Sequence, residues 1–148
     1  MFMRHARFVL ITLVLLTSLH ALADSSTPAG DYVIHHHALT TDTLDPAVAR
    51  TNGILRSKFR GMLNVTVIKG QPGTGGRSVG ARVEVNAGEP DQPAKRLPMR
   101  EIRMGEDVYY IGEFPVKDLQ VMAFTIEVTP EKTSETYRIN LEQPFFID

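Results

Sequence analysis

Three consecutive histidines, His35, His36 and His37, are the side chains in this sequence whose type and spacing most directly suggest chemistry. They lie in the segment YVIHHHAL, which has the composition of an extended strand. In a strand, His35 and His37 project from the same face with their Cβ atoms roughly 6.5–7 Å apart, close enough for two imidazoles to share a metal ion. One hypothesis is therefore a copper or zinc site, with Asp42 or Asp45 as the third ligand.

An ordinary structural role explains these histidines as well. A first strand can use histidine as a half-buried amphipathic residue, with one ring bonded to backbone and another facing water. The pair His35 and His37 also lacks the defined third and fourth ligands that a zinc site needs. We therefore keep metal binding as the alternative hypothesis, and the leading expectation includes no cofactor.

A basic segment, Arg56-Ser57-Lys58-Phe59-Arg60, is the second place where binding chemistry is expected. Cations interleaved with an aromatic ring can contact phospholipid headgroups or an acidic glycan. The planar fork of Arg56 can also bind a carboxylate or phosphate through two hydrogen bonds. The alternative is a structural role. The basic side chains could be solvated surface charges, or the Arg56 guanidinium could bond within the protein to an acidic side chain or to backbone carbonyls. Arg56, Ser57, Lys58 and Arg60 are the candidate binding residues.

Few residues in the sequence could support enzyme catalysis. Cysteine is absent, and beyond residue 23 the only histidines are the three adjacent ones, so a serine nucleophile has no histidine base outside that strand. The glycine-rich segment 70–76 lacks the Lys-Ser/Thr pair that follows a nucleotide-binding loop, so a flexible turn is expected there. The sequence predicts a protein that is not an enzyme.

Alternating apolar and polar residues predict strands along most of the chain. The clearest runs are 62–69 and 78–87, which we expect to form a hairpin around the glycine-rich turn. Segment 96–104 can be a strand only with Pro98 at an edge or bulge, and it is expected to form a second hairpin with 108–114. Further strands are expected over 119–128 and near 137–147.

One short helical turn is expected between the histidine strand and the basic segment. Asp45 is a good N-cap, Pro46 suits the first helical position, and Asn52-Gly53 supplies a left-handed stop. About seven strands at 8 to 12 residue spacing then predict an all-β fold, a small immunoglobulin-like β-sandwich. We expect residues 32–148 to form one domain, with 24–31 as a flexible leader.

The N-terminal segment 1–23 has the features of a cleavable signal peptide. Arg4 and Arg7 precede the apolar run FVLITLVLL, and Ala21-Leu22-Ala23 places small side chains where signal peptidase cuts. That run is shorter than the ~20 residues that span a bilayer, so cleavage is favoured over a membrane anchor. The expected location is the periplasm, with Asp24 as the first residue and no span left in the membrane.

Charge argues against a nucleic-acid partner. The chain has 16 basic and 17 acidic residues, and the signal peptide removes two of the basic ones, so the exported part is mildly acidic. Without cysteine there is no disulfide framework, and stability must come from packing.

Several segments together resemble an exported proteobacterial family, domain of unknown function 4426. The segments are YVIH from Tyr32, LDPAVA from Leu44, GI at Gly53, RSK from Arg56 and LNV from Leu63. The resemblance implies export and a β-rich fold over nearly the whole exported chain, and it implies no activity. In the family's pattern the position of His35 is usually histidine whereas the next two positions usually differ. This weakens the metal hypothesis and implies a shared structural or binding role for His35, Arg56, Ser57 and Asn64.

The leading hypothesis is a non-enzymatic periplasmic binding or accessory domain that acts on a protein or cell-envelope component. The alternative is a periplasmic copper- or zinc-binding protein that uses His35 and His37.

Overall fold

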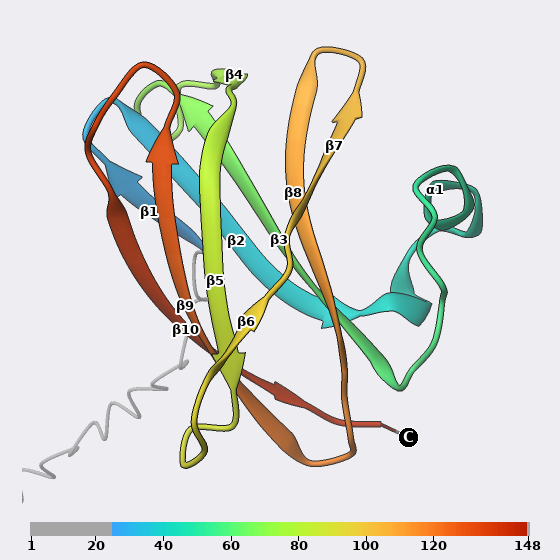
Figure 1. Cartoon of the computed structure of the whole chain (residues 1–148). Coiled ribbons are helices and arrows are strands. Elements are labelled where there is room, and N and C mark those ends of the chain that lie inside the picture. Colours follow the sequence, from blue (N-terminus) through green and yellow to red (C-terminus); the bar gives the residue numbers. More distant parts are fainter. Residues whose placement is uncertain (1–24, 148) are drawn as a thin grey trace, which may run out of the picture.

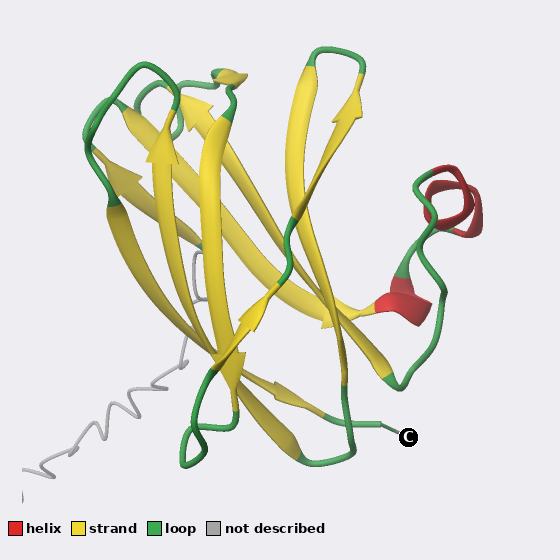
Figure 2. Ribbon diagram, viewed as in Figure 1, coloured by secondary structure: helices red, strands yellow, loops and turns green. Residues whose placement is uncertain are grey.

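Two antiparallel sheets pack face to face in the computed structural model, which describes residues 25–147 (Figures 1 and 2). The first sheet contains, in spatial order, β1 (Ser26–Ala29), β2 (Tyr32–Thr40), β3 (Arg60–Lys69), β8 (Asp107–Pro115) and β7 (Arg100–Met104), with β4 (Arg77–Ser78) also paired to β3. The second contains β10 (Tyr137–Phe145), β9 (Gln120–Pro130), β5 (Ala81–Gly88) and β6 (Lys95–Leu97). The predicted all-β sandwich is confirmed, with ten strands among the described residues in place of about seven. The predicted signal peptide lies outside the described residues.

The main core lies between the sheets and follows the alternation in the sequence. Leu63, Val65 and Val67 of β3 point inward and are completely buried, as their shared face predicts. They belong to the same apolar cluster as the inward residues of β9, which are Met122, Phe124, Ile126 and Val128.

A second, smaller core covers the outer face of the first sheet. The connection from β2 to β3 forms the 3-10 turn η1 (Thr41–Thr43) and the helix α1 (Pro46–Thr51), which lies beside that sheet (Figure 2). Ala49 and Ile54 from this connection pack against sheet residues that include Met62 and Ile111. The predicted helical turn is confirmed by α1. Asp45 is its N-cap, as predicted, and the Asp45 carboxylate accepts hydrogen bonds from the N–H groups of the first turn.

The predicted hairpin between 62–69 and 78–87 is wrong. Only Arg77 and Ser78 pair with β3, and the chain then crosses to the second sheet, where β5 pairs with β9 and β6. Two hydrogen bonds flank the crossing, one within the first sheet and one between the two sheets. The Ser78 hydroxyl accepts from Val108 N at 2.8 Å, and the Tyr110 hydroxyl accepts from Ala81 N at 2.8 Å.

The 96–104 segment is also split between the sheets. It forms β6 in one sheet and β7 in the other, and Pro98 lies in the crossing between them, where no ladder N–H is needed. The expected pairing of β7 with β8 is confirmed.

Residues 26–29, expected as part of a flexible leader, instead form β1. This strand pairs with β2 from Ser26↔His35 to Ala29↔Tyr32 across a tight turn in which Gly30 adopts φ +60°. Ala29 is buried, and His36 N donates to Ser25 O at 2.8 Å. The polar composition of this segment suggested a leader because its hydrogen-bonding partner, β2, cannot be read from composition.

Candidate functional site

The basic loop, residues 55–60, runs from the end of the helical connection into β3 and is anchored by one buried hydroxyl. Thr41 is completely buried, and its Oγ1 lies 2.8 Å from Leu55 O and 3.1 Å from Ser57 O, as a donor to these carbonyls. The same oxygen accepts from Ser57 N at 3.0 Å. The backbone of the basic loop is therefore fixed against η1 at its centre.

Further hydrogen bonds fix both flanks of the basic loop. Arg56 Nη2 donates to the backbone carbonyl of Asp42 at 2.6 Å. This hydrogen bond is the structural role that the sequence analysis gave as the alternative to ligand binding. Ser57 Oγ accepts from Phe59 N at 3.1 Å, and Phe59 O accepts from Val116 N at 3.0 Å. The predicted binding residues thus have different roles. Arg56 and Ser57 hold the backbone of the loop, whereas Lys58 is exposed to solvent.

Arg60 opens β3 and is partly covered. Its Nε is buried and has no hydrogen-bond partner within residues 25–147. Arg60 therefore does not present its whole guanidinium group to solvent.

Two large apolar side chains protrude from the basic loop. Leu55 is 66% exposed and Phe59 58% exposed, and the Lys58 ammonium lies 5.5 Å from the centre of the Phe59 ring. The loop therefore presents leucine, lysine and phenylalanine to solvent from a fixed backbone. The sequence pointed to the cations but missed Leu55 and the anchor Thr41, whose burial depends on tertiary packing.

The three histidines of β2 divide between the two faces of the sheet. His35 and His37 are exposed on the outer face, opposite Thr66 and Asn64 of β3. His36 is buried on the inner face, with Nε2 3.1 Å from Thr27 Oγ1. Partial burial lowers the pKa of His37, which keeps its ring neutral near pH 7.

The structure does not bring the suggested third metal ligand to these rings. Within residues 25–147, no three His, Cys, Asp or Glu side chains are grouped so that they could hold a metal ion. Asp45 is engaged as the helix cap, and Asp42 lies in η1. The outer face offers His35 and His37 alone as a two-histidine arrangement on one strand.

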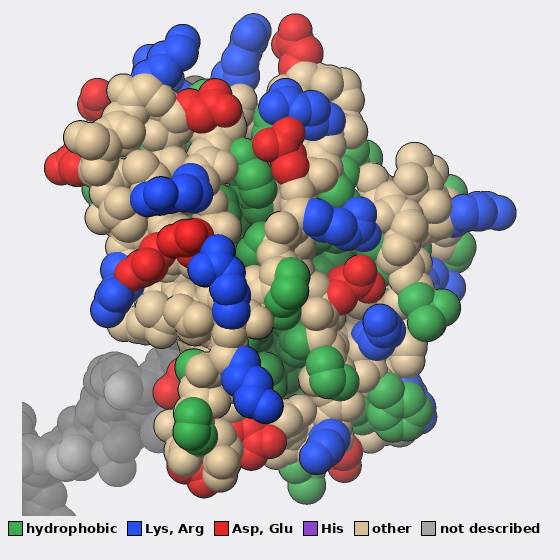
Figure 3. Space-filling view, viewed as in Figure 1, with side chains coloured by type: hydrophobic (Ala, Val, Ile, Leu, Met, Phe, Trp, Pro, Cys, Tyr) green, Lys and Arg blue, Asp and Glu red, His purple; other side chains and the backbone are tan. Residues whose placement is uncertain are grey.

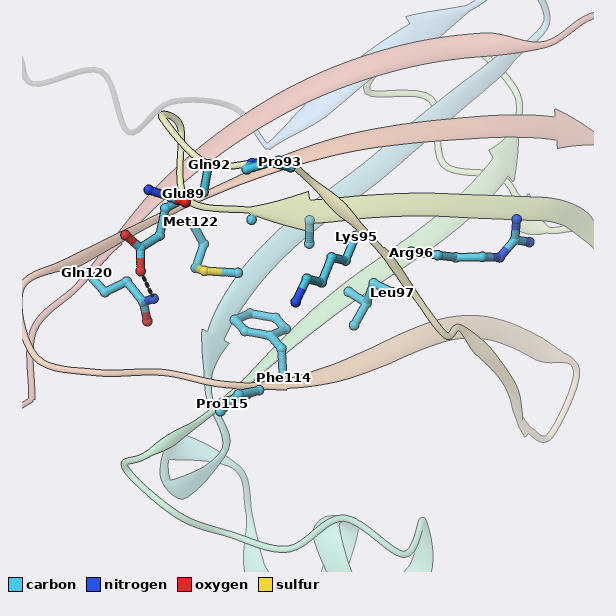
Figure 4. A pocket seen from close by; sticks show the side chains of 12 residues that line it. Glu89, Gln92, Pro93, Lys95, Arg96, Leu97, Phe114, Pro115, Gln120 and Met122 are labelled. Atoms are coloured by element: carbon cyan, nitrogen blue, oxygen red, sulfur yellow. Dashed lines mark hydrogen bonds between the residues drawn. The ribbon is translucent and has the colours of Figure 1, made fainter.

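A cleft of about 460 Å³ opens between the sheets, next to β6 and the end of β8 (Figure 4). Its wall includes the buried side chains of Leu97, Phe114 and Met122, and apolar atoms are visible in the groove between the sheets (Figure 3). The Lys95 side chain points into the cleft. No signal in the sequence marked this site, because its wall comes from four separate segments.

The surface around these sites carries interspersed charges of both signs (Figure 3). Five ion pairs join exposed or partly exposed side chains within the described part of the chain, such as Arg138 with Glu127. Within residues 25–147, no helix is both long and apolar enough to cross a bilayer.

Comparisons with known proteins identify a family and a fold. The family described as "Domain of unknown function (DUF4426)" matches residues 26–148. A DUF4426 family protein from Pseudomonas aeruginosa PAO1, PA0388, has a similar solved structure, with 24% identity, a TM-score of 0.69, and coverage of 83% of this chain and 94% of that chain. No curated protein matches the sequence.

A second similar structure is FetP of uropathogenic Escherichia coli, recombinantly expressed in the periplasm of E. coli. It is 7% identical with a TM-score of 0.58, covering 82% of this chain and 92% of that one. A copper-bound variant of FetP is 8% identical with a TM-score of 0.59, covering 83% and 95%. At these identities the likeness shows a shared fold.

Proposed function

The chain belongs to the DUF4426 family, and we propose that it is a non-enzymatic, exported binding domain that contacts an anionic component of the cell envelope through its basic loop. The observation that carries this proposal is the pairing of a fixed backbone with exposed apolar and cationic side chains. Thr41 and Arg56 hold the loop, while Leu55 and Phe59 protrude beside Lys58.

The chemistry of the loop fits an anionic phospholipid surface. Leucine and phenylalanine side chains can enter the boundary between headgroups and acyl chains, and neighbouring lysines are attracted to the negative surface. Because the Leu55 and Phe59 backbones are already ordered, binding does not require ordering of the loop. The predicted signal peptide supports a periplasmic location, where such a surface is available.

Sedimentation with lipid vesicles tests this proposal. We expect the folded domain to co-sediment with phosphatidylglycerol vesicles, to bind phosphatidylcholine vesicles weakly, and to be released by salt. Lys58→Glu and Phe59→Ser should each abolish sedimentation. Lys69→Glu and Met104→Ser are matched controls, because both side chains are exposed at the opposite ends of their strands from the basic loop.

The controls decide whether the basic loop is responsible. Equal losses for Lys58→Glu and Lys69→Glu would show general charge attraction and contradict the proposed role of the loop. A wild-type domain that stays in solution with both kinds of vesicle would contradict lipid as the component.

A second candidate function is supported by the outer face of β2, where His35 and His37 project side by side. The two histidines could together chelate copper or zinc at this face, and the similar FetP fold includes a copper-bound variant. Titration of untagged protein with Cu²⁺ alone, followed by visible absorption, tests it. Loss of binding in His37→Gln supports this candidate, and stoichiometric binding that survives in this variant contradicts it.

A further inference from the structure

We propose that the cleft between β6 and the end of β8 binds a small amphipathic monoanion, meaning an aliphatic body that carries one carboxylate. This site is separate from the basic loop and from the histidine face. The proposal combines three observations: a buried apolar wall, one cation directed into the cleft, and an acidic group already engaged on the opposite side.

The apolar wall is preformed. Leu97, Phe114 and Met122 are each at most 7% exposed, and all three line the cleft. The Phe114 ring is fixed by two aromatic neighbours, with ring centres 5.2 Å away at Phe124 and 5.8 Å away at Phe145. An aliphatic group entering the cleft therefore meets a wall that needs no rearrangement.

The cation of the cleft is Lys95. Its side chain extends toward Phe114 between Leu97 and Met122, whereas the guanidinium group of Arg96, which also lines the cleft, pairs with Glu84 at 3.1 Å (Figure 4). Among the ion pairs found within residues 25–147, none includes Lys95. Lys95 is an exposed residue that lines the cleft, so its positive charge lies beside the apolar wall and favours an anionic group on the ligand.

The opposite wall limits the charge of the ligand to one. Glu89 accepts a hydrogen bond from Gln120 Nε2 at 2.7 Å, and Gln120 Oε1 accepts from Lys117 N at 3.0 Å. This arrangement directs the carboxylate of Glu89 to a protein donor at the rim of the cleft. A second negative charge on the ligand would face Glu89 and be repelled.

The size of the cleft agrees with a small ligand. Its volume of about 460 Å³ falls within the range of about 300–1,000 Å³ that is common for small-molecule sites. The cleft is open to solvent, so a chain longer than the apolar wall can extend out of it.

Nuclear magnetic resonance of methionine methyl groups provides the test, on residues 25–148 as one folded domain. Decanoate is the probe, and decanol is its uncharged counterpart. We expect decanoate to shift the Met122 methyl signal and to leave Met62, which lies in the outer core, unchanged. Decanol should bind about tenfold more weakly, because it lacks the charge that pairs with Lys95.

Two variants test the assignment of the cation. Lys95→Met should reduce the affinity for decanoate to that of decanol, and Lys69→Met, at an exposed lysine outside the cleft, should leave it unchanged. A peptide that ends in leucine is a second probe: stronger binding of decanoate assigns a fatty acid, and stronger binding of the peptide assigns a chain end as the source of the carboxylate. An unchanged Met122 signal with both probes, or equal effects of the two variants, would overturn the proposal. Neither result depends on vesicle binding by the basic loop.

Discussion

The hydroxyl group of Thr41 connects segments that are 14 to 16 positions apart in the sequence. It satisfies backbone groups at Leu55 and Ser57 in a place that water does not reach, since Thr41 is completely buried. Buried polar groups are costly unless they are hydrogen-bonded, so one side chain stabilises the shape of the whole basic loop.

Thr41→Val removes this hydroxyl while keeping the side-chain shape. We expect the free energy of unfolding to fall by about 1–3 kcal/mol, because Ser57 N–H and the facing carbonyls lose their partner. Urea denaturation measures the change. Thr43→Val is the control, since its exposed hydroxyl bonds only to Thr40 O at 2.7 Å and its loss should cost less than about 1 kcal/mol. Equal losses for both variants would contradict the anchoring role.

His37 gives a pH dependence with a definite sign. Burial holds the pKa of His37 below its ordinary value of 6.5, so the unfolded chain takes up this proton at a higher pH than the folded chain. Stability from this residue is therefore present above pH 6.5 and is lost as the pH falls from that value through the lower pKa of the folded state. A titration of the His37 ring signals should give a midpoint below 6.5, and His37→Gln should flatten the stability profile in this range. A midpoint at or above 6.5 would contradict the effect of burial.

The histidine face shows how far single residues could be predicted. The period of a strand is two, so the sequence alone placed His35 and His37 on one face of β2. Whether an acidic side chain joins them depends on the path of the chain after β2, where Asp42 lies in η1 and Asp45 caps α1. Local periodicity fixes the direction of a side chain, while its distant neighbours follow from tertiary structure.

Among the elements, those determined by local interactions were predicted best. The helix α1 was predicted with its cap, because the Asp45 carboxylate bonds to N–H groups only two and three residues away. The pairing partners of β3 and β5 were not predicted correctly. Both strands have the same alternation of apolar and polar residues, and their proximity in the sequence suggested a hairpin. The chain instead crosses between the sheets after Ser78, and alternation carries no information about which sheet a strand joins.

The alternation itself can be tested within these strands. Val65 of β3 is completely buried between the sheets, so Val65→Asp places a charge without a partner in the core. We expect the free energy of unfolding to fall by about 3 kcal/mol or more. Val121→Asp on β9 is the control, because Val121 is 37% exposed and its charge can stay in water. A similar stability for the two variants in thermal denaturation would contradict the assignment of the inner face.

In the whole molecule, the two faces of the first sheet have different coverings. Its inner face packs on the second sheet, and the connection through α1 covers part of its outer face. The same connection carries the basic loop, so the segment that buries Ile54 also presents Leu55 and Phe59 to solvent. The cleft lies elsewhere, between the segment from the end of β5 to β6 and the segments at the end of β8 and the start of β9.

The strand β1 completes the edge of this first sheet, which leads to a prediction for the whole domain. A chain that starts at Asp31 lacks the pairing of β1 with β2, the burial of Ala29 and the hydrogen bond from His36 N to Ser25 O. It also leaves β2 as an exposed edge strand, which favours association between molecules. We expect its melting temperature to be lower by more than about 5 °C than that of a chain starting at Ser25, with more aggregation on heating. Equal melting temperatures in circular dichroism would mean that residues 26–29 behave as the flexible leader that their composition suggests.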